Sequence, residues 1–513
     1  MKKTNKCIFK IIKLLFYTII GIVFLGSTII TRLTEWFSQS FSISIPEILF
    51  TIKSPLQGAD TDFLKNAVKY CNIGVLIFQV IFYLGTVLIF ECIFSKIRVY
   101  LGICRKKNNK KILSINLYVI YIVCICIIIS ICAIKSIKFA DSKVHFFDFL
   151  KMQKASTKIY EEKYVNPVNI QVRGKRRNLI YIYVESLETT YASVDEGGIQ
   201  EINYIPNLTK IAKQYVNFSV NDSFGGFPSC FGSTWTMGAL FSSSTGVPFA
   251  FPVHGNSMNL HTSFANGITA MGDILSSKGY VQEFLCGSDG NFAGRKQFYE
   301  QHGNYRVFDL FTAREKGYIP DDYYVWWGFE DEILYRIAKD ELLQLAKEDK
   351  PFNFTMLTVD THHEGGYKCK LCGDKYSENL ANVVACADKQ IYEFINWIKE
   401  QDFYENTTIV IMGDHPRMDS ILINNTPYTE RYVYNCFINS NKTIKKSEKN
   451  RNFTTTDMFP TILSAMGFEI EGDRLGLGTD LFSETPTVSE EMGFEEFSTE
   501  LSKYSQFYID NFS

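Results

Sequence analysis

Two patterns of apolar residues divide this chain near residue 140. Before that point lie three long runs with hardly a charge, Leu14–Thr31, Ile73–Phe90 and Ile112–Ile134. An uncharged helix of 18 residues spans about 27 Å, close to the thickness of the hydrocarbon layer of a membrane. Because globular helices this apolar on every face are uncommon, we predict three transmembrane helices within residues 1–134. A cleaved signal peptide is the alternative for the first run, but apolar residues continue past Gly26 and two further runs follow.

The second pattern, after residue 177, is an alternation of short apolar runs with helical periodicity. Ala381–Lys399, for example, reads as a helix and is followed by the apolar run Thr407–Met412. This alternation predicts an α/β domain with a mainly parallel central sheet, which we place at residues 178–485. Residues 135–177 are charged and poor in glycine, and we predict a helical stalk there. Residues 486–513 are acidic and aromatic and are predicted to form a peripheral helix or tail.

Three apolar runs of this domain end in an acid or a histidine. Asn178–Val184 runs into Glu185, Phe354–Val359 into Asp360, His362 and His363, and Ile409–Met412 into Asp414 and His415. Ligands of open α/β sheets collect beyond the carboxyl ends of the strands, so these ends predict one shared metal site. Glu185, Asp414 and His415 offer a mixed oxygen and nitrogen set that suits Mn²⁺ or Zn²⁺, with Mg²⁺ less favoured.

A glycine-rich turn supplies candidate nucleophiles. The segment Gly225–Gly238 contains four hydroxyl side chains, Ser229, Ser233, Thr234 and Thr236, before an apolar run with helical character. A hydroxyl at a helix N-terminus lies in a partial positive field that suits a phosphate ester, although such residues also serve simply as helix caps. In a second glycine-rich loop, Asp289 and Arg295 are either pocket residues or a structural ion pair.

Charge sets the expected orientation in the membrane. Lysines and arginines crowd residues 2–13 and 96–111, and the positive-inside rule places both segments in the cytoplasm. An odd number of transmembrane helices then puts the later domain outside the cell. The net charge of −2 argues against nucleic acid as a partner.

Six of the 13 cysteines fall in the later domain. If that domain is outside the cell they can pair, and we expect Cys369 or Cys372 to pair with Cys386. The Cys369-Lys-Leu-Cys372 spacing would also suit zinc, but no second Cys/His pair stands at finger spacing, so the disulfide is favoured.

The later domain resembles the membrane-anchored phosphoglycerol transferases of the alkaline phosphatase and sulfatase superfamily. This group includes the glucan glycerophosphotransferases and the lipoteichoic acid synthases. The matching segments occur in the same order: Asn178–Glu188, Trp235–Thr236, Gly287–Gly294, Trp327–Glu332, Thr358–His363, Gly413–His415 and Arg474–Gly478. The Thr-His-His run and the Arg-Leu-Gly-Leu-Gly ending resemble the glucan-modifying branch most.

The resemblance implies roles for individual residues. Glu185, Asp414 and His415 would hold the metal, which is Mn²⁺ in related enzymes, and a threonine would both contact the metal and attack phosphorus. Thr236 fits the pattern of the glucan branch, with Thr234 as the alternative. His362 would bind or protonate the phosphoglycerol group, with Trp327 and His363 also in the substrate pocket. The synthases place an arginine where this chain has Phe329, so the way the pocket holds phosphate is left open.

The implied reaction is metal-dependent transfer of phosphoglycerol from phosphatidylglycerol to an acceptor in the bacterial cell envelope. A phosphoglycerol–threonine intermediate would form and diacylglycerol would be released. The acceptor is a glycan or polymer, such as a periplasmic glucan or a teichoic acid. The enzyme would be a multi-pass protein of the cell membrane with its catalytic domain outside the cytoplasm.

Three other functions are weighed against this reaction. Phosphoethanolamine transfer and phosphodiester hydrolysis would use the same metal and threonine, whereas an inactive envelope sensor would normally have lost the metal ligands. Sulfate-ester cleavage is disfavoured because no Cys-x-Pro-x-Arg pattern surrounds Cys230.

Overall fold

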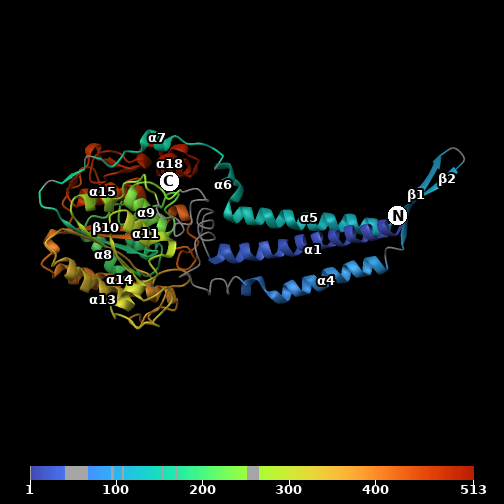
Figure 1. Cartoon of the computed structure of the whole chain (residues 1–513), viewed down its shortest axis with the longest axis horizontal. Coiled ribbons are helices and arrows are strands. Elements are labelled where there is room, and N and C mark those ends of the chain that lie inside the picture. The colour runs from blue at the N-terminus through green and yellow to red at the C-terminus, as the bar shows by residue number, and fades with distance from the viewer. Residues whose placement is uncertain are drawn as a thin grey trace. The chain divides into compact units, whose positions relative to one another are not determined.

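The chain divides into a helical unit and a globular unit in the computed structural model (Figure 1). The structure describes residues 2–40, 68–93, 97–106, 109–152, 154–168, 170–172, 174–250 and 265–512. The helical unit comprises the described residues up to Gln39 and from Val68 to Phe147, and the globular unit begins at Asp148. Each unit is described separately below.

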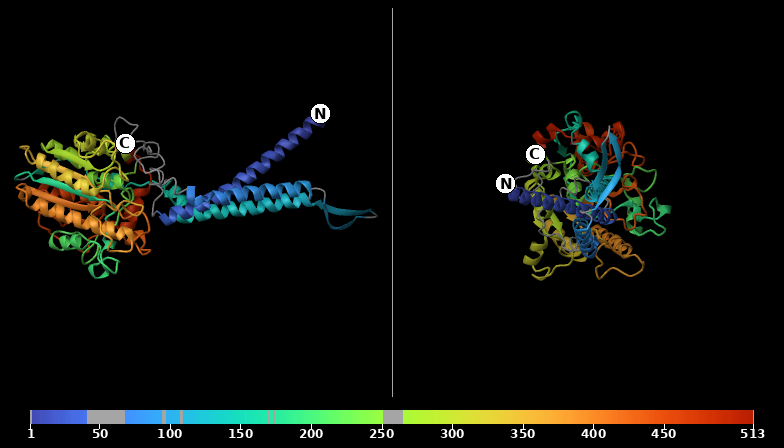
Figure 2. Two further views of the ribbon diagram at one scale, coloured as in Figure 1. Left: turned by 90° about the horizontal axis from the view of Figure 1, so that it is seen from below. Right: turned by 90° about the vertical axis from the view of Figure 1, so that its right-hand side faces the viewer.

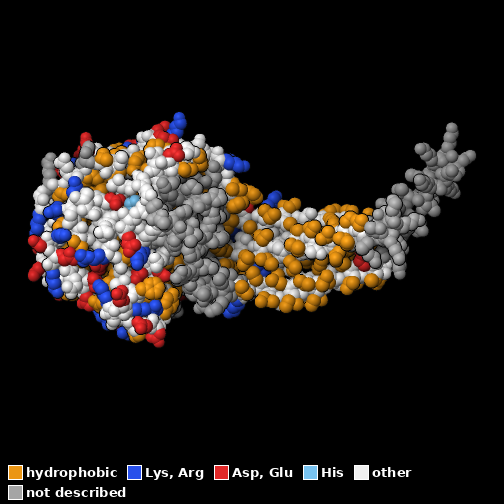
Figure 3. Space-filling model, viewed as in Figure 1, with side chains coloured by type: hydrophobic (Ala, Val, Ile, Leu, Met, Phe, Trp, Pro, Cys, Tyr) orange, Lys and Arg blue, Asp and Glu red, His pale blue; other side chains and the backbone are white. Residues whose placement is uncertain are grey.

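Three helices form most of the helical unit, α1 (Lys2–Ser40), α4 (Ile73–Cys92) and α5 (Leu117–Val144). The segments Ile11–Ser38, Val68–Cys92 and Val119–Val144 are long and apolar enough to cross a membrane. Figure 3 shows apolar side chains over much of the visible surface of this unit, as expected of helices in contact with lipid. The prediction of three apolar membrane helices is therefore confirmed in length and composition.

Polar contacts within the apolar region connect these helices. The Tyr83 hydroxyl of α4 donates a hydrogen bond to the Tyr17 carbonyl of α1 at 2.6 Å, and Gln79 donates to the Thr28 hydroxyl at 2.8 Å. Tyr83 also packs with Ile20 and Ile129 in a small apolar core. Such contacts satisfy polar groups that lipid cannot.

The segment between α4 and α5 extends beyond Ile112, where the third transmembrane run was predicted to begin. It contains an antiparallel hairpin of β1 (Arg98–Lys106) and β2 (Asn109–Asn116), with Arg98 opposite Asn116. Residues 112–116 of the predicted third transmembrane run therefore belong to a strand instead. Polar residues interrupt that part of the sequence, which makes it a poor beginning for a membrane helix. Two of the basic residues used to orient the chain, Lys96 and Lys107, lie outside the described residues.

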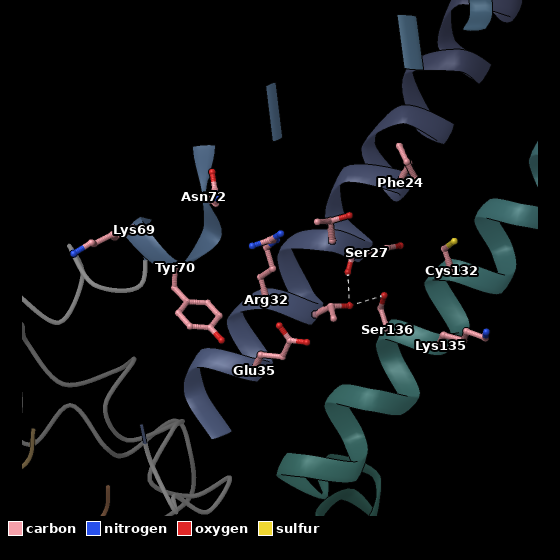
Figure 4. A pocket seen from close by; sticks show the side chains of 12 residues that line it. Phe24, Ser27, Arg32, Glu35, Lys69, Tyr70, Asn72, Cys132, Lys135 and Ser136 are labelled. Carbon is pink, nitrogen blue, oxygen red and sulfur yellow. Dashed lines mark hydrogen bonds between the residues drawn. The ribbon is translucent and has the colours of Figure 1, made fainter. Parts of the chain in front are cut away.

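A polar cavity lies at one end of the helical unit (Figure 4). Its volume is about 580 Å³. It is lined by three cationic side chains, one carboxylate and several hydroxyls, among them Arg32, Glu35, Lys69, Lys135 and Ser136. The Thr31 hydroxyl of α1, which also lines the cavity, donates to the Ser136 hydroxyl of α5 at 3.0 Å.

A seven-stranded sheet forms the centre of the globular unit (Figure 2). The strand order is β5-β10-β9-β4-β8-β6-β7. The strands are β4 (Asn178–Val184), β5 (Gly226–Phe227), β6 (Val281–Cys286), β7 (Arg306–Phe308), β8 (Phe352–Leu357), β9 (Thr407–Gly413) and β10 (Val433–Ile438). The pairings among β9, β4, β8, β6 and β7 are parallel, and β10 and β5 are added antiparallel at one edge. The predicted α/β fold with a mainly parallel sheet is confirmed.

Both faces of the sheet are buried, which explains why its central strands are apolar throughout rather than alternating. In β4, Leu179, Tyr181 and Tyr183 enter one apolar core, and Ile180 and Ile182 enter the other. The first core includes residues of α9 (Thr236–Thr245), α10 (Met271–Ser277), α11 (Arg295–Gln301) and α15 (Met458–Ala465). The second includes residues of α8 (Pro206–Gln214), α12 (Leu310–Glu315), α13 (Asp331–Leu345) and α14 (Asn379–Lys399).

The later part of the predicted stalk and the predicted tail pack into the core of this domain. The stalk begins as the end of α5 and continues into two short helices, α6 (Phe146–Met152) and α7 (Ile159–Lys163). Tyr160 of α7 is buried in the core, and β3 (Gln171–Val172) pairs with β11 (Phe468–Glu469).

The C-terminal residues form α16 (Val488–Met492), α17 (Phe494–Ser502) and α18 (Gln506–Phe512). Tyr508 of α18 packs edge-on against Tyr160, with ring centroids 5.1 Å apart. The aromatic residues of these helices therefore belong to the core, whereas a peripheral helix or tail was expected. A short two-stranded sheet, β12 (Arg474–Leu475) with β13 (Gly478–Thr479), accompanies them.

Candidate metal centre

The register of the sheet brings two of the predicted metal ligands together. In the parallel pair β4 and β9, Val184 lies opposite Gly413, so Glu185 and Asp414 are the next residues on adjacent strands. Gly413 has no room for a side chain, since a Cβ there would lie 1.9 Å from the Leu187 carbonyl oxygen. The close approach of the two chains at this point allows both carboxylates to occupy one site.

Glu185, Asp414 and His415 form a buried group whose potential ligand atoms all lie within 4.8 Å of one another. The Nε2 atom of His415 lies 3.5 Å from Glu185 Oε1 and 3.3 Å from Asp414 Oδ2. Glu185 is 2% exposed, and the other two side chains are fully buried. Two carboxylates held this close without solvent repel each other, and a divalent cation between them would remove that repulsion.

Hydrogen bonds orient these side chains toward a common point. His415 Nδ1 is 2.9 Å from the Pro416 carbonyl and donates to it, which leaves the lone pair of Nε2 facing the carboxylates. Asp414 Oδ1 accepts from the backbone amides of Ser186 and His415, both at 2.8 Å. Within the described residues, Asp414 Oδ2 accepts no hydrogen bond. An imidazole fixed through its other nitrogen and an unsatisfied buried carboxylate oxygen both fit a metal ligand set.

The pKa values reflect the same crowding. Burial, and then the charge of Glu185, raise the pKa of Asp414 to about 7. Burial also acts to raise the pKa of Glu185, but His362 and His415 outweigh it and hold that pKa below its ordinary value. The metal-free site therefore keeps one carboxylate charged and favours a proton on the other.

Thr236 is the hydroxyl that reaches this group. It is the first residue of α9, and its Oγ1 donates to Glu185 Oε2 at 3.3 Å and lies 3.4 Å from His415 Nε2. Thr234, the alternative nucleophile, has a buried hydroxyl with no hydrogen-bond partner among the described residues. The helix N-terminus adds a partial positive charge at Thr236.

His362 and Trp327 lie beside Thr236. All three line one small cavity, together with Arg295 and Phe292. The Trp327 ring packs 4.8 Å from the His362 ring, measured between centroids. His362 Nδ1 lies 2.5 Å from the His363 carbonyl and donates to it, so Nε2 is the nitrogen left to accept a proton. Burial lowers the pKa of His362 below 6.5, so the ring is neutral at pH 7.

His363 and Asp360 follow the same strand as His362, but their side chains make other contacts. His363 stacks on His362 with ring centroids 4.2 Å apart, and the described lining of the cavity does not include it. Asp360 does not join the metal group as the strand-end pattern had suggested. Its Oδ1 accepts the backbone amide of Asp331 at 3.1 Å, and Asp331 in turn accepts the amides of Val359 and Asp360. Asp360 thus fixes the loop that leads to His362.

Arg295 is a pocket residue and not the partner of the Asp289 carboxylate. Its guanidinium donates to the Ser288 hydroxyl and to the Asp289 carbonyl, both at 2.9 Å, and does not pair with the Asp289 carboxylate among the described contacts. Because Arg295 also lines the cavity, it places a cation beside Thr236 and His362.

Two buried arginines beneath the site were not singled out from the sequence. Arg431 forms a fully buried ion pair with Glu188, and its Nε donates to Glu188 Oε2 at 2.8 Å. Arg417 pairs with Asp419 and donates to the Thr361 carbonyl at 2.6 Å. Together these bonds connect the segments that carry Glu185, His362 and His415. Arginine beside an acid is too common in sequences to have marked them.

Comparison with known proteins identifies the family of the globular domain. The family model described as Sulfatase matches residues 177–468, more than half of the chain. The chain belongs to the sulfatase family. A relative of this sulfatase-family chain, phosphoglycerol transferase I of Xanthomonas axonopodis pv. citri, is 33% identical over 255 residues, 48% of this chain and 35% of the relative. The protein of the same name from Escherichia fergusonii is 31% identical over 328 residues, 61% of this chain and 40% of the relative. The chain thus spans well under half the length of these curated relatives.

Among solved structures, a protein in the alkaline phosphatase superfamily from Vibrio parahaemolyticus is similar, with a TM-score of 0.49 and 22% identity. The match covers 67% of this chain and 79% of that one. The lipoteichoic acid synthase LtaP from Listeria monocytogenes has a TM-score of 0.47 and 20% identity, over 61% of this chain and 79% of its own.

Proposed function

We propose that this protein transfers phosphoglycerol from phosphatidylglycerol to a glycan or polymer of the cell envelope. The observation that carries the proposal is the position of Thr236, whose hydroxyl lies within 3.4 Å of two members of a buried metal-type ligand group and at a helix N-terminus. A hydroxyl so placed suits covalent catalysis on a phosphodiester. The relatives named phosphoglycerol transferase I support the choice of head group.

Glu185, Asp414, His415 and Thr236 would hold the metal. Manganese is the proposed ion because the set mixes two carboxylates with one imidazole. When bound, it would lower the pKa of a coordinated hydroxyl and neutralise charge on phosphate oxygens.

In the first half-reaction the Thr236 oxygen forms a bond to phosphorus, and the bond between phosphorus and the diacylglycerol oxygen breaks. His362, which lines the same cavity, takes up the Thr236 hydroxyl proton on Nε2 and passes it to the departing oxygen, which leaves as diacylglycerol. Arg295 and the N-terminus of α9 supply positive charge beside the phosphoryl group. The product is a phosphoglycerol–threonine ester.

In the second half-reaction an acceptor hydroxyl attacks the same phosphorus. His362 takes the proton of that hydroxyl on Nε2, because its Nδ1 is committed to the His363 carbonyl and burial keeps the ring neutral. The bond between phosphorus and the Thr236 oxygen breaks, and His362 returns the proton to that oxygen, so both residues regain their initial state. Trp327 would pack against the glycerol, and His363 would support the position of His362.

The membrane helices fit a lipid donor. With both basic segments in the cytoplasm, the odd number of candidate spans would place the catalytic domain on the outer side, where the outer leaflet supplies phosphatidylglycerol. Reporter fusions after Ile134 test this orientation. A cytoplasmic signal there would contradict it.

The reaction itself is tested by release of labelled diacylglycerol from phosphatidylglycerol by the purified full-length protein. We expect release with Mn²⁺, and none after chelation or in Thr236→Ala. Thr234→Ala is the matched control and should keep the activity. Release from phosphatidylethanolamine alone would replace this proposal with phosphoethanolamine transfer, and release of free glycerol phosphate without any acceptor product would favour a phosphodiesterase.

A further inference from the structure

Three cysteines converge next to the loop that carries His362. Cys369 and Cys372 lie in that loop and Cys386 lies on α14. None of the three forms a disulfide. Cys369 Sγ lies 3.6 Å from Cys372 Sγ and 3.8 Å from Cys386 Sγ, and all three sulfur atoms lie within 4.8 Å of one another. The structure thus brings the expected partners together, but it forms no disulfide.

These distances match a metal–thiolate site. Sulfur atoms at 2.3 Å from a tetrahedral zinc ion are separated from one another by about 3.8 Å. A disulfide would need about 2.05 Å between two of them and would leave the third cysteine over. Thiolates prefer zinc to manganese or magnesium, so such a site would select a different ion from the one at Glu185 and Asp414.

The backbone between Cys369 and Cys372 forms a turn, as is common between two metal-binding cysteines. The Cys372 amide donates to the Cys369 carbonyl at 3.1 Å, which turns the chain so that both sulfurs face the same way. The third ligand comes from a helix 14 residues after Cys372. A single third cysteine at this distance does not form the second Cys/His pair that a zinc finger requires.

We propose that Cys369, Cys372 and Cys386 bind a zinc ion, with a solvent molecule as the fourth ligand on the half-exposed side of Cys372. The ion would fix the loop between His362 and α14. One end of that loop is already anchored by the Gly366 amide on the His362 carbonyl, and the other by Asn382 of α14, which pairs with the Tyr376 backbone. This site is independent of the proposed reaction.

Metal analysis of the full-length protein in detergent tests the proposal. We expect about one zinc per chain, retained in Asp414→Asn, which disables the other site, and lost in Cys386→Ser. Cys436→Ser is the matched control, because Cys436 is a buried cysteine of β10 outside the cluster and should leave the zinc in place. Replacement of zinc by cobalt should give thiolate-to-cobalt charge-transfer absorption, which an oxygen and nitrogen site does not produce.

A second pair of variants guards against misfolding. Cys372→Ser should lose the metal, while Cys372→His, which keeps a zinc ligand, should restore it. Zinc that persists in both Cys386→Ser and Cys372→Ser would overturn the proposal. So would a disulfide between any two of the three cysteines in the native protein, found by peptide mass mapping without reduction.

Discussion

Replacing Asp414 with asparagine should stabilise the metal-free protein and destabilise the metal-bound one. The two carboxylates of the site are buried, and burial with the charge of Glu185 raises the pKa of Asp414 from 3.8 to about 7. The folded chain therefore holds a proton that the unfolded chain releases, and stability falls as pH rises between these two values. The loss is complete above pH 7 and absent below the unfolded pKa. At 1.36 kcal/mol per pH unit it amounts to about 4 kcal/mol at most.

Asparagine carries no charge, and its oxygen can still accept the Ser186 and His415 amides that now reach Asp414 Oδ1. In the presence of a chelator at pH 8, Asp414→Asn should thus unfold at a higher temperature than the parent protein, with no difference near pH 4. Adding Mn²⁺ should reverse the order, because binding stabilises only a site that has both carboxylates.

The assay is thermal unfolding of the full-length protein in detergent, with exposed Asp402→Asn as the charge-matched control. A chelated Asp414→Asn variant that unfolds at or below the temperature of the parent at pH 8 would refute the reasoning. Equal stabilisation of both proteins by Mn²⁺ would refute the ligand assignment.

Two further predictions follow from buried groups around the site. Glu188→Ala leaves the buried Arg431 guanidinium unpaired and should lower the free energy of unfolding by about 3–5 kcal/mol in denaturant titration. Loss of the exposed Glu393, which pairs with Lys389 on the same helix, should change that free energy by less than about 1 kcal/mol. Equal effects would show that the buried pair is not structural. His362→Asn should slow transfer about 10²- to 10⁴-fold. Because burial lowers the His362 pKa, the parent should lose activity only as pH falls below 6.5, and a pH profile unchanged by the substitution would exclude His362 as the base.

Much of the site could be read from the sequence because it follows strand ends. Glu185 and Asp414 directly follow buried parallel strands, so the fold itself brings them together once the strands are identified. Thr236 required the resemblance to a family, since a threonine before a helix is ordinarily a cap. The pairing of Asp360 with Asp331 was not predictable, because it depends on where the beginning of α13 meets a loop 29 residues away.

The periphery of the fold was harder to predict for a related reason. Tyr160 and Tyr508 are far apart in the sequence and meet only in the folded domain, so neither the predicted stalk nor the predicted tail contained a local signal of burial. The cysteine cluster is a similar case: we expected Cys369 or Cys372 to pair with Cys386, and the structure brings the three together without a disulfide.

The central claim is that Thr236 carries the phosphoglycerol group between donor and acceptor. The most direct measurement is peptide mass mapping of the full-length protein after brief incubation with Mn²⁺ and phosphatidylglycerol labelled in its terminal glycerol, without acceptor. The account predicts label on the peptide that contains Thr236, none in Thr236→Ala, and release of the label when acceptor is added. Substitution at this first helical position should alter stability by less than about 1 kcal/mol, because Trp235 occupies the cap. Diacylglycerol release without label on that threonine, or label on Thr234 instead, would contradict the claim.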